Sequence, residues 1–176
     1  MKIFIDGSAG TTGLRIKDRL MKRSDVELTT LSEEQRKDTE SRKQALNSAQ
    51  VAFLCLPDAA AVEAVELVEN PDTVIIDTST AHRTSEGWAY GFPELSAEFE
   101  DKIKNSKRIA VPGCHAGGFI ALVYPLVEAG VLGNDALLSC YSLTGYSGGG
   151  KKMIAEYESE DKSPLLFAPR QYGLTQ

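Results

Sequence analysis

One cysteine stands in a setting that makes a thiol nucleophilic. The run Val111-Pro-Gly-Cys-His-Ala-Gly-Gly118 joins a short apolar segment to an apolar helical pattern, so Cys114 is expected at the start of a helix. The helix dipole and the free backbone N–H groups at that position favour the thiolate. The small neighbouring residues leave room for a substrate, and the same N–H groups suit an oxyanion. We therefore predict that Cys114 is a covalent nucleophile.

The other cysteines and the histidines have less distinctive surroundings. Cys55 and Cys140 lie inside apolar runs and are predicted to be small buried side chains. The 3 cysteines are widely spaced, which fits reduced thiols rather than a disulfide framework or a metal site, so no metal is expected. His115 is a candidate base or substrate contact by its proximity to the thiol. His82 either binds substrate or caps a turn.

A glycine-rich turn follows the first strand pattern, in the run Asp6-Gly-Ser-Ala-Gly-Thr-Thr-Gly13. Such glycines allow a tight turn, the approach of a phosphate and close packing of the next helix, whose N-terminus attracts an anion. The spacing G-x-x-G-x-x-G differs from the usual G-x-G-x-x-G, and a purely structural turn is the alternative. We predict a dinucleotide-binding loop formed by Gly7, Ser8, Gly10, Thr11, Thr12 and Gly13.

The end of the second strand pattern bears on the choice of cofactor. NAD enzymes usually place Asp or Glu there to hold the ribose 2′-hydroxyl, whereas this chain has Leu28-Thr-Thr-Leu-Ser32 followed by Arg36 and Lys37. Hydroxyl groups and a cation accept a 2′-phosphate. We therefore expect NADP as the cofactor, with Ser32 and Arg36 in its site. The alternative is that these charges only form a solvated helix face.

Apolar runs alternate with helical patterns along the chain. We expect strands over residues 2–6, 26–31, 51–56, 73–77, 108–111 and 136–143, and helices over 12–22, 33–48, 58–69, 116–129 and 151–159. The third and fourth strands are almost uniformly apolar, as buried parallel strands are. The order predicts an α/β fold with a doubly wound, Rossmann-like parallel sheet. The polar loop from Thr78 to Pro93 is long enough to be functional.

Composition limits the classes of partner. The net charge of -6 is unfavourable for binding a nucleic-acid backbone, so we expect a small-molecule partner and no nucleic acid. No run reaches the ~18 apolar residues of a membrane span, and no signal core opens the chain. A cytoplasmic location without a membrane partner is therefore expected.

Six segments resemble, in the same order, those of N-acetyl-γ-glutamyl-phosphate reductase, particularly its shorter type 2 form. They are Gly7–Gly13, Phe53–Pro57, Asp77–Arg83, Tyr90–Leu95, Pro112–Ala116 and Gly145–Lys151. Aspartate-semialdehyde dehydrogenase shares the architecture and the thioester chemistry. However, the Tyr90–Leu95 and Pro112–Ala116 runs resemble the reductase better.

The resemblance implies a reaction and further site residues. NADPH would reduce N-acetyl-glutamyl 5-phosphate to the semialdehyde and phosphate through a thioester on Cys114, a step of arginine biosynthesis. By the same resemblance, Ser79 and Arg83 lie in a substrate-facing loop, and Gly148 and Gly149 lie near the nicotinamide. An arginine suits a carboxylate or phosphate because its fork binds two oxygens, and a loop-anchoring ion pair is the alternative role.

The resemblance also implies a division into domains. Residues 1–112 would form the NADP-binding Rossmann domain, and residues 113–176 would begin an α+β catalytic and dimerisation domain, with a homo-oligomer at full length. Family members continue past the position of Gln176, and we expect their general-base histidine beyond it. Two alternatives stay open: a truncated, non-catalytic NADP-binding module, and a reductase of another acyl phosphate such as aspartyl phosphate.

Overall fold

A parallel sheet of six strands forms the centre of the computed structural model, which describes residues 1–160. The strands are β1 (Lys2–Asp6), β2 (Glu27–Thr29), β3 (Val51–Leu54), β4 (Val74–Asp77), β5 (Ala89–Tyr90) and β6 (Arg108–Ala110). Their order is β2-β1-β3-β4-β6-β5, and every neighbouring pair is parallel. The predicted Rossmann-like sheet is confirmed.

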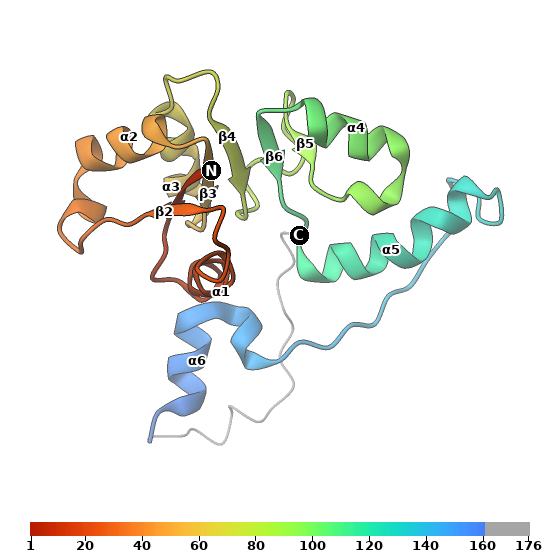
Figure 1. Ribbon diagram of the computed structural model, residues 1–176. Helices are drawn as coiled ribbons and strands as arrows, with labels where there is room; N and C mark the ends of the chain where they lie inside the picture. Colours follow the sequence, from red (N-terminus) through yellow and green to blue (C-terminus); the bar gives the residue numbers. More distant parts are fainter. Residues whose placement is uncertain (161–176) are drawn as a thin grey trace.

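The direction of the connections decides which helix covers which face. The helices that link the first strands are α1 (Thr11–Leu20), α2 (Thr39–Ser48) and α3 (Asp58–Glu66). The chain moves one way from β1 to β2 and the other way afterwards. Because such crossovers are right-handed, α1 lies on one face and α2 and α3 on the other, as Figure 1 shows. A crevice therefore opens between β1 and β3 at the carboxyl edge of the sheet.

The core lies between the sheet and the pair α2 and α3. Phe4, Leu46, Leu54 and Ile75 are fully buried there. A buried charge borders this core, since the Asp6 carboxylate at the end of β1 lies 3.0 Å from an Arg42 guanidinium nitrogen on α2. Arg42 also contacts Glu63 on α3. This ion pair joins the end of β1 to both helices, because a buried carboxylate requires a partner.

The predicted helix over residues 33–48 is two separate elements. A short 3₁₀ helix, η1, covers Gln35–Lys37, and α2 begins only at Thr39. Between them, the Asp38 carboxylate accepts a hydrogen bond of 2.8 Å from the backbone N–H of Ser41. An Asp at this position caps α2 by accepting from a backbone N–H group that has no partner inside the helix. A new helix therefore begins there.

One helix within the described residues was not predicted. This helix, α4 (Ala97–Asn105), follows a short 3₁₀ helix η2 (Pro93–Leu95). The Ser96 hydroxyl caps it by accepting the Phe99 N–H. Two ion pairs at the spacing of one helical turn, Glu98–Lys102 and Glu100–Lys104, lie on its surface. Both signals are local, so the sequence contained the evidence for this helix.

The predicted strand over residues 136–143 is wrong. These residues form no regular structure and pair with no strand among residues 1–160. A strand gains its stability from a ladder with a neighbour, and none is beside this segment in the described part of the chain. Its side chains are consequently exposed, and Leu137, Tyr141 and Leu143 are each more than three quarters accessible.

The C-terminal described elements lie at the periphery. The helix α5 (Cys114–Glu128) leads away from the sheet, and the chain then returns below α1 to η3 (Tyr146–Gly149) and α6 (Gly150–Glu158), as Figure 1 shows. Residues 161–176, the end of the predicted second domain, lie outside the described residues. None of the helices in residues 1–160 has both the length and the apolar composition that crossing a membrane requires.

The turn after β1 makes a first prediction. Gly7 has φ 82, and a Cβ placed on it would lie 2.2 Å from the Cys55 carbonyl oxygen. Gly87 has a similar φ of 80 but open space around it. Gly87→Ala should therefore cost about 1 to 2 kcal/mol, the price of a left-handed residue, and Gly7→Ala should cost more because the backbone must also move. Urea unfolding measures both, and equal losses would contradict the steric argument.

Candidate active site

The glycine turn presents an open helix start at the crevice between β1 and β3. Gly10 is the N-cap of α1, and within residues 1–160 no side chain caps the first N–H groups of the helix. Thr11 and Thr12 form its first turn. A Cβ on Gly13 would lie 2.4 Å from the Gly7 carbonyl oxygen, so the helix packs directly on the turn. This geometry fits a bound pyrophosphate.

A small cavity of about 300 Å³ lies beside this turn. It is lined by Ala9 of the turn together with Glu33, Arg36 and Lys37. The buried Arg36 Nε has no hydrogen-bond partner among the described residues. The Ser32 hydroxyl accepts the Gln35 N–H at 3.2 Å and so shapes the segment that carries these cations. The structure thus brings the predicted Arg36 next to the glycine turn, with a donor that suits an anion.

Cys114 is the first residue of α5, which confirms its predicted position at a helix start. Gly113 is the N-cap and provides no side-chain cap. The thiol is exposed and borders a cavity of about 700 Å³ between the first turns of α5 and residues 138–145. His115 lies on the same cavity, with Nδ1 within hydrogen-bond distance of the Ser142 hydroxyl. The site therefore offers a thiol and a histidine at the N-terminus of a helix.

The glycine-rich turn after residue 144 meets this cavity only in part. Gly145 lines it, whereas Gly148 and Gly149 lie in η3 and are not among its lining residues. A Cβ on Gly149 would contact the Met153 side chain of α6. The predicted place of Gly148 and Gly149 near the nicotinamide remains a prediction.

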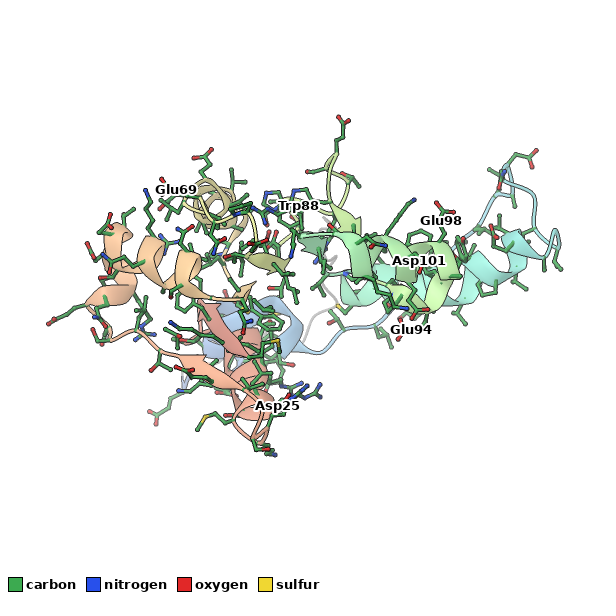
Figure 2. The ribbon with its side chains drawn as sticks, turned by 45° about the horizontal axis from the view of Figure 1, so that its top comes forward. Asp25, Glu69, Trp88, Glu94, Glu98 and Asp101 are labelled. Atoms are coloured by element: carbon green, nitrogen blue, oxygen red, sulfur yellow. The ribbon has the colours of Figure 1, made fainter. Side chains whose placement is uncertain are left out.

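The loop after β4 is built on a buried carboxylate. Asp77 has no exposed surface, and it accepts the Ser79 N–H at 2.9 Å and the Ser79 hydroxyl at 2.6 Å. His82 Nδ1 lies 2.7 Å from the same carboxylate. The imidazole stacks on Trp88, with ring centroids 4.1 Å apart. Figure 2 shows Trp88 near the middle of the molecule. Ser79, predicted to face substrate, thus holds the loop with its hydroxyl.

Arg83 connects this loop to the segment that precedes the thiol. Its Nε donates to the Val111 carbonyl at 2.9 Å, and Nη2 donates to the Thr78 carbonyl at 3.4 Å. The Val111 N–H in turn donates to the Asp77 carbonyl at 2.8 Å. The buried Nη1 has no hydrogen-bond partner in the described part of the chain. Within residues 1–160, Arg83 therefore anchors the loop through backbone carbonyls rather than through an ion pair.

A second carboxylate holds the residue Thr80 near the start of the same loop. Asp58, the first residue of α3, accepts the Thr80 N–H at 2.9 Å and its hydroxyl at 2.5 Å. The hydroxyl of Thr80 lowers the pKa of Asp58 below its usual range, so this carboxylate stays ionised and its bonds stay strong. The first part of the loop, residues 79–82, is thus fixed by Asp77 at the end of β4 and by Asp58, which follows β3.

The three thiols differ in their surroundings. Burial raises the pKa of Cys55 to about 11, an effect that the Thr78 hydroxyl partly offsets. Cys114 and Cys140 are exposed. The predicted burial of Cys140 is wrong, because the segment around it has no sheet to pack against in residues 1–160. Within that range no three His, Cys, Asp or Glu side chains gather in a way that suits a metal ion.

Residues 2–105 match the family described as semialdehyde dehydrogenase, NAD binding domain. The chain belongs to the semialdehyde dehydrogenase family. It is 52% identical over 174 residues to an N-acetyl-gamma-glutamyl-phosphate reductase of Chelativorans sp. (strain BNC1), covering 99% of this chain and 56% of the relative. N-acetyl-gamma-glutamyl-phosphate reductase 2 of Pseudomonas putida is 49% identical over 98% of this chain and 55% of its own length. The predicted resemblance is confirmed, and the chain spans about half the length of these curated relatives.

Solved structures of the family share the fold. An aspartate semialdehyde dehydrogenase from Francisella tularensis superposes with a TM-score of 0.64 at 17% identity, over 89% of this chain and 48% of that chain. The Candida albicans enzyme, solved with NADP, has a TM-score of 0.51 at 18% identity, over 72% of this chain and 46% of that one. These two solved structures therefore share the fold of this chain.

Sequence reasoning missed three residues that organise the site. Asp77 and Asp58 hold the loop after β4, and Trp88 stacks on His82. One signal was available for Asp77, because a carboxylate at the end of an apolar strand is buried and must find partners nearby. No local pattern indicates that Asp58 meets Thr80 or that Trp88 meets His82, since those contacts depend on tertiary packing.

The different exposure of the three thiols leads to a second prediction. Iodoacetamide at about pH 8 should modify Cys114 and Cys140 in the folded protein and spare Cys55, because only the thiolate reacts and Cys55 keeps its proton up to a pH near 11. Raising the pH toward that value, or unfolding the chain in urea, should expose Cys55 to labelling. Peptide mass spectrometry follows each site. Early modification of Cys55 in the folded protein would contradict its assigned burial.

Proposed function

We propose that this chain is the nucleotide-binding and thiol-bearing part of an NADPH-dependent reductase of N-acetyl-glutamyl 5-phosphate, acting in arginine biosynthesis. The observation that carries the proposal is an exposed thiol at the start of α5, beyond the carboxyl end of a strand. The glycine turn follows β1 of the same parallel sheet, so both sites lie at one edge. The identity to curated N-acetyl-gamma-glutamyl-phosphate reductases supports this substrate. Residues 1–112 then hold the cofactor, and residues from 113 onward begin the catalytic domain.

Cys114 supplies the covalent step. Its sulfur forms a bond to the acyl carbon while the bond from that carbon to the phosphate oxygen breaks, which gives a thioester and phosphate. The thiol lies at the N-terminal end of α5, where the helix dipole favours the negative charge that develops on the acyl oxygen. Once the thioester carbon is reduced, the bond between that carbon and the Cys114 sulfur would break, its electron pair would return to sulfur, and the aldehyde would leave. Cys114 is thereby regenerated.

The residues present fit a nicotinamide dinucleotide phosphate. A Cβ on Gly7 or Gly13 would meet backbone atoms, so glycine allows this tight turn, and the N-terminus of α1 beside it attracts a pyrophosphate. The Arg36 Nε, which has no hydrogen-bond partner in the described part of the chain, suits a 2′-phosphate. When bound, the nicotinamide supplies the hydride. The protein's part is to hold it at the edge of the sheet that carries Cys114.

Arg83 and His115 are proposed to bind the substrate. The buried Nη1 of Arg83, which has no hydrogen-bond partner among residues 1–160, suits an anionic oxygen of the substrate, and its other nitrogens are already held by backbone carbonyls. His115 lines the Cys114 cavity and orients its ring through Ser142. Ser79 acts through Asp77, because its buried hydroxyl is bonded to that carboxylate.

The proposed assembly of the full-length protein is a homo-oligomer. Apolar side chains along α5 and just after it are exposed, among them Leu122 and Val131 at 75% and 69%. Apolar surface of this extent favours contact with further protein. We infer that this face belongs to the catalytic and subunit-interface part of the enzyme.

Turnover tests the covalent role of Cys114. Incubation with phosphate, NADP and N-acetyl-glutamate semialdehyde should form NADPH, and Cys114→Ser should reduce the rate by at least ~1,000-fold because the thioester cannot form. The matched control is Cys140→Ser, an equally accessible thiol, which should keep the wild-type rate. Absorbance of NADPH gives the rate. Turnover that survives Cys114→Ser would refute the covalent mechanism. Binding of NADP without turnover would favour a non-catalytic module.

Cofactor preference tests the Arg36 cavity. Arg36→Met should weaken NADP binding about tenfold, or about 1.4 kcal/mol, because one charge-assisted contact to the 2′-phosphate is lost. Binding of NAD should change little, since NAD lacks that phosphate. Arg15→Met on α1 is the matched control and should alter neither affinity. Equal effects on NAD and NADP, measured by calorimetry, would show that Arg36 does not read the 2′-phosphate.

A further inference from the structure

The position of Arg83 depends on a short segment of loop. Its guanidinium reaches the Val111 carbonyl, three residues before Cys114, and the Thr78 carbonyl at the start of its own loop. A long side chain holds such a position only if its backbone is fixed. The residue directly before it, His82, provides the strongest anchor of this part of the loop.

His82 is held in two perpendicular ways. In the plane of the ring, Nδ1 lies 2.7 Å from the buried Asp77 carboxylate. Across the face of the ring, Trp88 stacks with an interplanar angle of 12°. The backbone completes the turn, because the His82 carbonyl accepts the Ser85 N–H and the Ser85 carbonyl accepts the Trp88 N–H. A ring fixed in its plane and on its face leaves the neighbouring residue little freedom.

Direct contact between His82 and substrate does not fit these surroundings. The residue is only 8% exposed, and Nδ1 is directed to Asp77. By contrast, Arg83 keeps one buried nitrogen without a hydrogen-bond partner among residues 1–160. His82 therefore holds the loop, and Arg83 presents a positive charge.

We propose that His82 is a positioning residue that holds the Arg83 guanidinium beside the segment leading to Cys114, through its bond to Asp77 and its stack on Trp88. The inference rests on the proposed function, in which Arg83 attracts the anionic end of the substrate. Its effect is electrostatic: the held guanidinium attracts an anion that approaches the thiol.

The test compares two alkylating reagents on Cys114. Iodoacetate is an anion and iodoacetamide is neutral, and both react with the same thiolate, so the ratio of their rates cancels any change in thiol pKa. One unit charge at ~10 Å in water changes the approach of an anion about twofold. Arg83→Met should lower the ratio about twofold. Arg108→Met, which removes another arginine bonded to backbone carbonyls but at the opposite end of β6, should leave the ratio unchanged.

Variants of His82 separate positioning from packing. His82→Phe keeps a ring against Trp88 but loses the bond to Asp77, and it should lower the ratio toward that of Arg83→Met. His82→Asn keeps a donor for Asp77 but loses the stack on Trp88, and its ratio should lie between those of His82→Phe and the wild type. Asp77→Asn is a second route if His82→Phe does not fold, and it should lower the ratio by weakening the same bond. Rates come from mass spectrometry of the Cys114 peptide.

Three results would overturn the proposal: an unchanged ratio in Arg83→Met, an unchanged ratio in folded His82→Phe, or an equal loss in His82→Phe and His82→Asn. The assay needs neither cofactor nor turnover. Failure of the reductase reaction would therefore leave this result intact, and a negative result here would leave the reductase proposal standing with Arg83 held by other means.

Discussion

Buried carboxylates at the ends of strands impose the strongest constraint on this structure. Asp6 ends β1 and Asp77 ends β4, and both are almost completely removed from water. An unpaired buried charge costs several kcal/mol, so each carboxylate must recruit partners from elsewhere in the chain. Asp6 recruits Arg42 of α2. Asp77 recruits the backbone and side chains of the loop that follows it. Two negative charges thereby fix the elements that surround the carboxyl edge of the sheet.

The segments of the candidate site lie at that edge. Parallel strands deliver their carboxyl ends to one side, so the glycine turn after β1, the loop after β4 and the thiol after β6 share it although they are far apart in sequence. The Arg83 side chain donates to the Val111 carbonyl, and the Val111 N–H donates to the Asp77 carbonyl, so these two bonds set the spacing between the loop and the segment before Cys114. The geometry of the candidate site is thus a consequence of sheet topology and of a few polar contacts.

The apolar strands and the position of Cys114 could be predicted from local sequence signals. The strands with continuous apolar runs were found because their side chains are buried on both faces, and Cys114 was placed correctly because small residues separate a strand from an apolar helix. Contacts between distant residues were not predictable, such as the stack of His82 on Trp88. The segment 136–143 shows the converse failure: its residues favour a strand, but strand structure requires a neighbour as well as a preference. Cys140 is exposed for the same reason, because its segment has no neighbouring strand among residues 1–160.

Trp88 is the only tryptophan in the sequence, and its indole lies face to face with the imidazole of His82. Light absorbed by indole therefore reports on one loop rather than on the whole molecule. Changes in emission intensity or wavelength follow the packing of that ring, so ordinary fluorescence distinguishes local opening of the loop beside the thiol from unfolding of the sheet. The protein thus has a built-in optical probe at the edge where its chemistry is proposed to occur.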